Sequence, residues 1–295
     1  MEGGLPAYDR WNLAALPESA LDFLVSRYIV RHGLTLLVGE GGASKSWLAL
    51  DLAIALAVGD CWMGQDCAIT RSVYFDEDGS EIESVRRYRR LCAARELKPD
   101  DPRLVANFSM VPAQGLHLEK ADIVARVCDT IEAYGAHLVI FDALVAIHGM
   151  EENSNNEMKF IMRERIRAIM RVKGVTVLLI HHLAKANELS IPGTSQIRGA
   201  GEIVNASDAA LLAKAKDGGH QLSMVRSKMI AKDKWPAALE YQLMDRDDST
   251  HIALSRLTDD QLRHMHQAGK TFRQLEQETG ISRSRLNRIV SGVPH

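Results

Sequence analysis

The segment from Gly39 to Ser46 holds the side chains with the clearest chemistry. It reads Gly-Glu-Gly-Gly-Ala-Ser-Lys-Ser, the phosphate-binding pattern G-x-x-x-x-G-K-[ST] with Ser44 in place of the second glycine. In this pattern backbone N–H groups surround a phosphate, the lysine (Lys45) supplies charge to the β- and γ-phosphates, and the last hydroxyl reaches Mg²⁺. The sequence therefore predicts a site for ATP and Mg²⁺. The expected nucleotide-contacting residues are Gly39, Gly41, Gly42, Ala43, Ser44, Lys45, Ser46 and Trp47.

A second candidate is Asp142, which follows the apolar run Leu138–Phe141. Such a run predicts a buried strand that delivers a carboxylate at its C-terminal end. In nucleotide-binding α/β sheets the ligand lies at that edge. We therefore expect Asp142 to hold Mg²⁺, through water or together with the Ser46 hydroxyl.

The predicted strand Ser72–Phe75 also ends in acid, at residues 76–78. One of these carboxylates could polarise the water that attacks the γ-phosphate. A solvated strand end is the simpler interpretation, and the residues alone leave the choice among the three acids open.

A third predicted strand ends in two histidines, His181 and His182. One imidazole could hydrogen-bond the γ-phosphate and report its loss to the loop that follows, and we favour His182 for this role. A zinc site is the alternative. Adjacent residues of an extended chain point to opposite sides, and no Cys or third ligand follows at a useful spacing.

Cationic residues occur in two later segments. The long loop after the histidines carries Lys185 and Arg198 and is a candidate for contacting a nucleic-acid backbone, with a plain surface loop as the alternative. Arg226 and Lys228 stand two residues apart on a predicted strand and so share a face. Such a pair could reach the γ-phosphate bound by a neighbouring subunit, and an exposed charged edge strand is the alternative.

Short apolar strands separated by helices must position these side chains. This alternation predicts an α/β fold with a mainly parallel sheet covered on both faces, extended by a hairpin over residues 221–243. The expected strands are Leu34–Val38, Ser72–Phe75, Leu138–Phe141, Val175–Ile180 and Ala209–Leu212, and the expected helices are Ser46–Val58, Glu81–Arg95, Lys120–Tyr134 and Asn156–Val172. The predicted organisation is an approach segment (1–30), an ATPase domain (31–245), a polar linker (246–256) and a small all-α unit (257–295).

The C-terminal unit has the pattern of a helix-turn-helix, with a turn at Gly280 and a serine before the last helix. Its predicted core is Phe272, Leu275, Ile281, Leu286 and Ile289. The last helix carries Arg283, Arg285 and Arg288 and no acid, which suits contact with DNA bases or phosphates. Protein docking is the other known use of such units.

Composition limits the class of protein. The chain of 295 residues has 46% hydrophobic residues and a net charge of −2, so any nucleic-acid binding must come from local patches. Four cysteines without a C-x-x-C pair argue against disulfide or zinc frameworks. No apolar run approaches the length of a membrane span. We expect a soluble, cytoplasmic protein.

These motifs together carry a family resemblance. The order phosphate loop, Phe-Asp-Glu-Asp, Val-Ile-Phe-Asp, Ile-His-His-Leu-Ala-Lys, Ile-Arg-Gly-Ala-Gly resembles the RecA-like core of plasmid RepA-type hexameric replicative helicases and their phage and plasmid relatives among the AAA ATPases. The resemblance covers roughly residues 15–245. It implies that Lys45, Ser46 and Asp142 bind Mg-nucleotide. It further implies that Glu77 activates water and that His182 senses the γ-phosphate.

The resemblance also implies an assembly. Subunits would form a hexameric ring with single-stranded DNA in the centre, contacted by the loop around residues 185–198. Arg226 or Lys228 would reach across a subunit interface, and the match there is too loose to choose between them. Ser44 is the second departure from the family pattern.

The expected function is therefore an oligomeric DNA-dependent ATPase, of the kind found in replicative helicases or translocases of plasmids, phages or mobile elements. One alternative is a DNA-binding regulator or loader that uses ATP as an assembly switch, with duplex DNA held by the C-terminal unit. Another is an ATPase of residual activity that acts mainly as an interaction platform, an idea supported only by Ser44.

Overall fold

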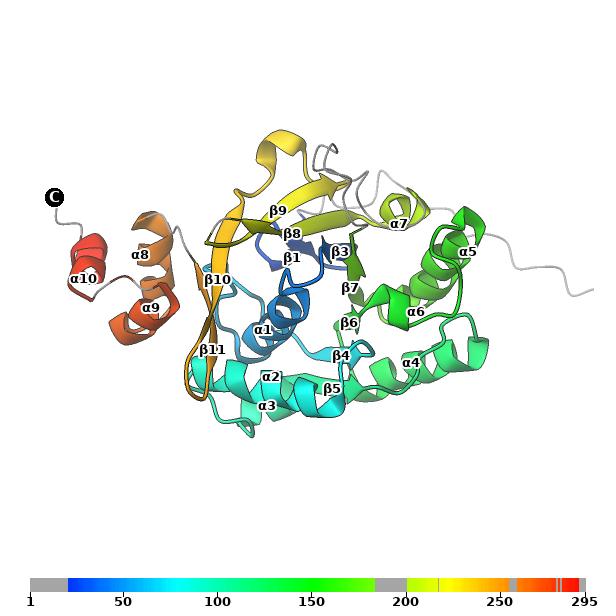
Figure 1. The fold of residues 1–295 in the computed structure, drawn as a ribbon, viewed down its shortest axis with the longest axis horizontal. Coiled ribbons are helices and arrows are strands. Elements are labelled where there is room, and N and C mark those ends of the chain that lie inside the picture. Colours follow the sequence, from blue (N-terminus) through cyan, green and yellow to red (C-terminus); the bar gives the residue numbers. More distant parts are fainter. Residues whose placement is uncertain are drawn as a thin grey trace, which may run out of the picture.

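A nine-stranded sheet forms the centre of the chain in the computed structural model, which describes residues 21–183, 201–216, 218–254, 259–279, 281 and 283–291 (Figure 1). Across the sheet the strands are β11 (Thr250–Leu254), β10 (Leu239–Asp245), β9 (Gly219–Ser227), β8 (Ala209–Lys216), β3 (Leu34–Gly39), β7 (Thr176–His182), β6 (Leu138–Asp142), β4 (Ser72–Asp76) and β5 (Phe108–Pro112). The strands from β8 to β5 are parallel, and β9, β10 and β11 add an antiparallel extension. This confirms the predicted α/β class.

The carboxyl ends of β3, β4, β6 and β7 meet at one edge of the sheet. The backbone register pairs Asp76 with Asp142 and Gly39 with His182. Residues far apart in the sequence are therefore neighbours here, as expected for the ligand-binding edge of a parallel sheet.

Helices cover both faces of the sheet. One face is covered by α1 (Lys45–Val58), α2 (Glu81–Ala94) and α3 (Pro102–Asn107). The other is covered by α4 (Ala121–Tyr134), α5 (Asn155–Lys159), a π-helical stretch (Phe160–Ile166), α6 (Arg167–Arg171) and α7 (Gly201–Ala206). A short hairpin of β1 (Phe23–Val25) and β2 (Ile29–Val30) packs on the first face, since Leu24 and Ile29 belong to the same buried cluster as α1.

Alternation along β3 divides the core between the two faces. Leu37 belongs to the cluster around α1, whereas Leu34, Leu36 and Val38 belong to the cluster under α4 to α7. This is the period of two expected for a strand with both faces buried.

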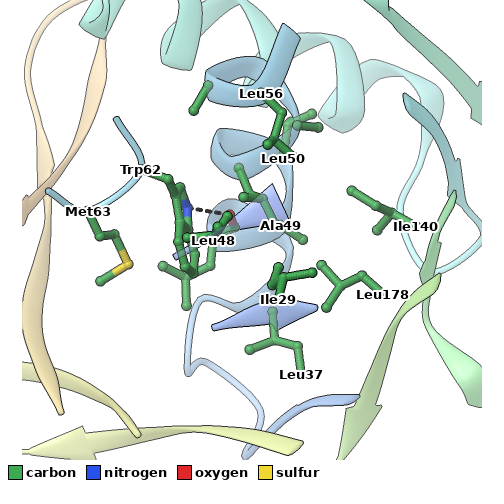
Figure 2. Close-up of a cluster of buried hydrophobic side chains, with 14 of the residues drawn as sticks. Ile29, Leu37, Leu48, Ala49, Leu50, Leu56, Trp62, Met63, Ile140 and Leu178 are labelled. Carbon is green, nitrogen blue, oxygen red and sulfur yellow. Dashed lines mark hydrogen bonds between the residues drawn. The ribbon is translucent and has the colours of Figure 1, made fainter. Parts of the chain in front are cut away.

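Helix α1 lies deep in this core, as Figure 2 shows. Leu48, Ala49, Leu50 and Leu56 lie among side chains of β3, β6 and β7, and the Trp62 indole donates a hydrogen bond to the Leu48 carbonyl at 3.2 Å. Because α1 is apolar nearly all round, its sequence shows no polar face. This burial anchors the first turn of α1, which carries the phosphate loop.

The segment 246–256 was expected as a linker, and this prediction is wrong in part. Residues 246–249 form a tight turn, and β11 follows as the edge strand of the sheet. The Arg90 side chain fixes this turn, because its guanidinium donates to the carbonyls of Arg246 and Ser249 and to the Thr250 hydroxyl. The acidic residues of the turn made the whole segment resemble a linker in sequence, so the short buried strand that follows was not predicted.

Three helices follow, α8 (Asp259–Gln267), α9 (Phe272–Thr279) and α10 (Arg283–Ser291), which we call the three-helix unit. All five predicted core residues belong to its apolar cluster, together with Leu262 and Met265. The unit lies beyond β10 and β11 in Figure 1. Three of its side chains face acids of the α/β part of the chain, in the pairs Lys270–Asp60, His264–Asp66 and Arg273–Glu96.

Among the described residues, no helix has the length and apolar character needed to cross a membrane.

Candidate functional site

The phosphate loop connects the end of β3 to the start of α1 and includes two left-handed residues. Gly42 has φ of 82°, and Ser44, the residue before α1, has φ of 61° and ψ of 25°. This conformation costs an L-residue about 1–2 kcal/mol but is nearly free for glycine. The substituted position is thus one where glycine fits the backbone best, and Ser44 adopts the required conformation at a cost.

Lys45 lies under the loop and is only 6% exposed. Its ammonium donates hydrogen bonds to the carbonyls of Gly39 and Glu40, each at 2.9 Å. Burial lowers the pKa of Lys45, against the opposing charges of Asp142, Asp78 and Glu40. The cation is therefore held in place by weak neutral acceptors, which phosphate oxygens can replace.

Asp142, at the end of β6, is 1% exposed and is oriented by a neighbour. The Tyr74 hydroxyl of β4 donates to its Oδ2 at 2.6 Å. Burial raises the pKa of Asp142 to about 6, while hydrogen bonds from Tyr74 and Ser46 act to lower it. Its other oxygen, Oδ1, is buried without a hydrogen-bond partner among the described residues.

This donor set fits a magnesium ion. A buried carboxylate oxygen left without a partner is costly, and a hard cation satisfies it. The Ser46 hydroxyl lies beside the same carboxylate. Mg²⁺ bound by both side chains keeps several other positions for water and phosphate oxygens.

Asp78 and His182 complete the polar wall. The His182 Nε2 lies 4.0 Å from an Asp78 carboxylate oxygen, so the ends of β4 and β7 are joined across the site. With these residues the loop lines an open cleft of about 470 Å³, within the size range of small-molecule sites. Its lining residues are Gly41, Gly42, Ser44, Lys45, Ser46, Trp47, Asp78, Arg87, Asp142, His182 and Leu243.

Glu77 is placed differently from the sequence expectation. Its carboxylate accepts hydrogen bonds from the backbone N–H groups of Gln114, Gly115 and Leu116, at 2.9, 2.8 and 3.2 Å. It does not line the cleft. The structure therefore brings the carboxylate of Asp78, and not that of Glu77, to Lys45.

Comparison with known proteins agrees with this geometry. A family model described as AAA domain matches residues 5–188. The chain belongs to the AAA domain family. The comparison with curated proteins finds no match.

Solved structures share the fold of this chain. It is similar to a KaiC-like protein from Pyrococcus horikoshii OT3, with a TM-score of 0.51 and 10% identity over 78% of this chain and 93% of that chain. It is also similar to the RadB recombinase, with a TM-score of 0.51 and 16% identity over 73% of this chain and 89% of that chain. The central sheet and its flanking helices thus have the RecA-like P-loop NTPase fold.

Two further residues of the chain line the cleft without having been expected. Arg87 of α2 lies over the ring of Trp47, with its guanidinium carbon 5.9 Å from the ring centroid, and Leu243 closes the wall from β10. Only the fold brings α2 and β10 to the loop, so no local pattern could have shown this. Of the expected contacts, Gly39 and Ala43 do not line the cleft. Gly39 instead allows the close approach of β8, because a Cβ there would lie 2.4 Å from the Ala213 carbonyl oxygen.

The two candidate finger residues differ in their surroundings. The Lys228 ammonium donates to the Asn205 carbonyl at 2.7 Å and lies 3.8 Å from Asp208, so it is engaged within its own chain. The Arg226 Nε is buried and has no hydrogen-bond partner in the described part of the chain. The two residues therefore differ in their contacts within the chain.

The expected DNA-contacting residues are only partly described. Lys185 and Arg198 lie outside the described residues, as does the Arg285 side chain. Arg288 is exposed on α10, and Arg283 is exposed and pairs with Glu276 of α9 at 2.6 Å. The cationic end of the chain is thus a solvent-facing surface rather than a pocket.

Proposed function

We propose that this protein is a cytoplasmic, homo-oligomeric DNA-dependent ATPase. In this proposal it acts as a replicative-type helicase or translocase of a plasmid, phage or mobile element and hydrolyses ATP between subunits of a hexameric ring. One observation carries the ATPase part. Lys45, Ser46 and Asp142 meet in one cleft, with a buried carboxylate oxygen left for a cation.

In the proposed mechanism, Lys45 exchanges its bonds to the Gly39 and Glu40 carbonyls for bonds to the β- and γ-phosphates. Ser46 and Asp142 would hold Mg²⁺, which would supply positive charge to the phosphates. The N–H groups of the loop and the N-terminus of α1 add positive potential at the same place. The aromatic ring of Trp47 and the Arg87 guanidinium form the remaining wall of the cleft.

We propose Glu77 as the group that activates water, since it adjoins Asp78 at the end of β4. In this role its carboxylate exchanges the N–H groups of residues 114–116 for water when nucleotide binds. Asp78, which already faces the cleft, is the alternative. Comparing Glu77→Gln with Asp78→Asn decides between them, because loss of turnover with retained ATP binding marks the water-activating acid.

His182 is proposed to sense the γ-phosphate. It lies in the cleft at the end of β7, and the chain continues from it toward Lys185 and Arg198, which are proposed to contact single-stranded DNA. Because this segment directly follows His182 in the sequence, a change in the contact of His182 with the γ-phosphate would reach the DNA-contacting residues through a short stretch of chain. His182→Ala is expected to retain basal turnover while losing acceleration by DNA.

Arg226 is proposed as the finger that acts on a neighbouring subunit. A cation supplied in trans accelerates phosphoryl transfer by about 10³–10⁵-fold. Lys45→Ala and Arg226→Ala should therefore each be inactive alone. Mixed together they should regain activity, because some interfaces then combine an intact Lys45 with an intact Arg226. Mixtures that stay inactive would argue against hydrolysis between subunits.

Electron microscopy of the full chain with a non-hydrolysable ATP analogue tests the assembly. A closed ring threaded by single-stranded DNA is expected. A monomer or dimer under these conditions would contradict the motor.

The second candidate function is a DNA-binding regulator or loader with an ATP-dependent assembly switch. The three-helix unit supports it, because the helix-turn-helix proposed there exposes Arg288 on its last helix. Sequence-specific binding to duplex DNA by the Lys45→Ala chain, with no unwinding by the parent chain, would favour this candidate over the motor.

A further inference from the structure

Two aromatic side chains from the antiparallel strands lie beneath the phosphate loop. The Tyr241 hydroxyl of β10 donates to the Ala43 carbonyl at 3.0 Å, and Tyr241 is fully buried. His220 of β9 stacks on Tyr241, with ring centroids 5.2 Å apart and an interplanar angle of 19°. Its Nε2 lies 3.3 Å from the Gly42 carbonyl oxygen, as a donor in the tautomer protonated at that nitrogen.

These contacts act on the carbonyl side of the loop. A peptide unit is planar, so fixing its carbonyl oxygen also fixes the direction of the N–H group that follows. The bonds to the Gly42 and Ala43 carbonyls therefore orient the N–H groups of Ala43 and Ser44. The Ala43 N–H donates to the Glu40 carbonyl at 3.2 Å and holds the turn of the loop, and the Ser44 N–H is the one we expect to bind phosphate.

The peptide unit that Tyr241 contacts, Ala43–Ser44, adjoins the left-handed residue, and the unit that His220 contacts, Gly42–Ala43, precedes it. Ser44 is left-handed at φ 61°, a conformation that its Cβ disfavours. A neutral hydrogen bond contributes a free energy of the same order as this cost. Hydrogen bonds of this kind are therefore strong enough to hold the loop in the strained conformation.

We propose that Tyr241 and His220 are positioning residues that hold the phosphate loop ready for nucleotide and offset the strain of Ser44. Neither touches the phosphates, and both act through the loop backbone. The inference rests on the proposed binding of ATP in this cleft, and it names which residues outside the motif set the affinity of that site.

The simpler interpretation is that Tyr241 is an ordinary core tyrosine with a satisfied hydroxyl. The two interpretations differ in one measurable respect. A core role predicts the same loss for Tyr241→Phe whichever residue occupies position 44. A positioning role predicts a larger loss with serine there than with glycine.

The experiment is a double-mutant cycle on ATP affinity in the full chain, with titration calorimetry as the readout. Tyr241→Phe should weaken ATP binding about fivefold with Ser44, the equivalent of one hydrogen bond. It should have less than about a twofold effect in the Ser44→Gly background, where the left-handed conformation costs little. His220→Phe, which keeps the ring and removes the Nε2 donor, should show the same dependence with a smaller loss.

Tyr28→Phe provides the matched control. Tyr28 is also buried and its hydroxyl also donates to a carbonyl, that of Ala237 at 2.7 Å, away from the loop. It should lose stability comparable to Tyr241→Phe with ATP affinity unchanged. Equal losses of affinity for Tyr241→Phe in the two backgrounds, or no loss in either, would overturn the inference. Absence of ATP binding by the parent chain would instead refute the proposed function.

Discussion

The nucleotide cleft and α10, the last helix of the three-helix unit, differ in how far their charged side chains are exposed to solvent. In the cleft, Lys45 and Asp142 are 6% and 1% exposed, and each has a small set of defined partners. On the three-helix unit, Arg283 and Arg288 project into solvent. Charges removed from water interact strongly and specifically, whereas exposed charges are screened by salt. Single changes should therefore be severe in the cleft and mild on the unit.

The junction between the two regions is itself charged and buried. The Arg95 guanidinium binds both carboxylate oxygens of Asp51, on α1, at 2.7 and 2.9 Å, and also contacts Asp60. Lys270 of the three-helix unit donates to the same Asp60 at 3.2 Å. Helix α1, which begins at Lys45, is thereby connected to the unit through ion pairs.

The largest expected effect is the loss of turnover in Lys45→Ala. Removal of the cation that meets the transferred phosphoryl group should lower ATP hydrolysis by about 1,000-fold, measured by phosphate release. Lys98→Ala, at an exposed lysine, is the matched control and should be unchanged. DNA binding by the three-helix unit should persist in both variants. Turnover above a tenth of the parent rate in Lys45→Ala would contradict the assignment of the cleft.

Arg95→Ala should break the junction. It leaves Asp51 and Asp60 without their shared cation, and loss of one partner of a buried ion pair costs about 3–5 kcal/mol. Urea unfolding measures this loss. Arg103→Ala, which removes an exposed pair with Asp101, should leave the unfolding midpoint nearly unchanged. Equal effects of the two variants would show that the junction is not a stabilising network.

A pH titration of Mg²⁺ affinity tests the role of Asp142 in the cleft. Burial raises the pKa of Asp142 to about 6, and protons compete with Mg²⁺ for the carboxylate. Affinity for Mg²⁺ in the presence of ADP should therefore be constant well above pH 6. Below the pKa it should fall about tenfold per pH unit. Tyr74→Phe removes a hydrogen bond that lowers the pKa, so the midpoint should move upward.

Asp142→Asn is the control for this titration, because protonation of the nucleotide itself still affects Mg²⁺ affinity in this variant. It should bind Mg²⁺ weakly, and its affinity should lack the pH dependence that comes from the Asp142 carboxylate. A parent profile identical in shape to that of Asp142→Asn would rule out the carboxylate as the titrating ligand.

Features set by contiguous residues could be predicted from the sequence, whereas features set by contacts between distant residues could not. The phosphate loop, its strand and helix, and the acids at strand ends are contiguous patterns, so their positions could be inferred. The contacts of Glu77 with residues 114–116 and of Tyr74 with Asp142 join separate elements. No spacing along the chain encodes such contacts, and they decide which carboxylate faces the cleft.

Other features were not predicted because of the residues within or beside the element itself. Strand β5 is half-buried along its length and lacks an apolar run. Strand β11 directly follows the acidic and polar turn at 246–249, and this polar stretch indicated a linker rather than a strand. Arg226 and Lys228 looked equivalent in sequence, and only the contacts of Lys228 with Asn205 and Asp208 separate them.

The smallest expected effect concerns the surface of the three-helix unit. Arg288→Ala should weaken DNA binding by a few-fold and reduce the slope of log affinity against log salt by about one, the loss of one phosphate contact. Arg273→Ala, whose side chain faces Glu96 of the ATPase domain, is the control and should leave that slope unchanged. An unchanged slope in Arg288→Ala would remove α10 from the DNA-contacting surface.

The central claim is that the cleft hydrolyses Mg-ATP in response to DNA. It is tested most directly by the steady-state ATPase rate of the purified full chain, with and without single-stranded DNA, beside Lys45→Ala. Hydrolysis should require Mg²⁺, rise when single-stranded DNA is added, and be abolished by Lys45→Ala. A rate that does not respond to DNA, or that survives in Lys45→Ala, would contradict the central claim.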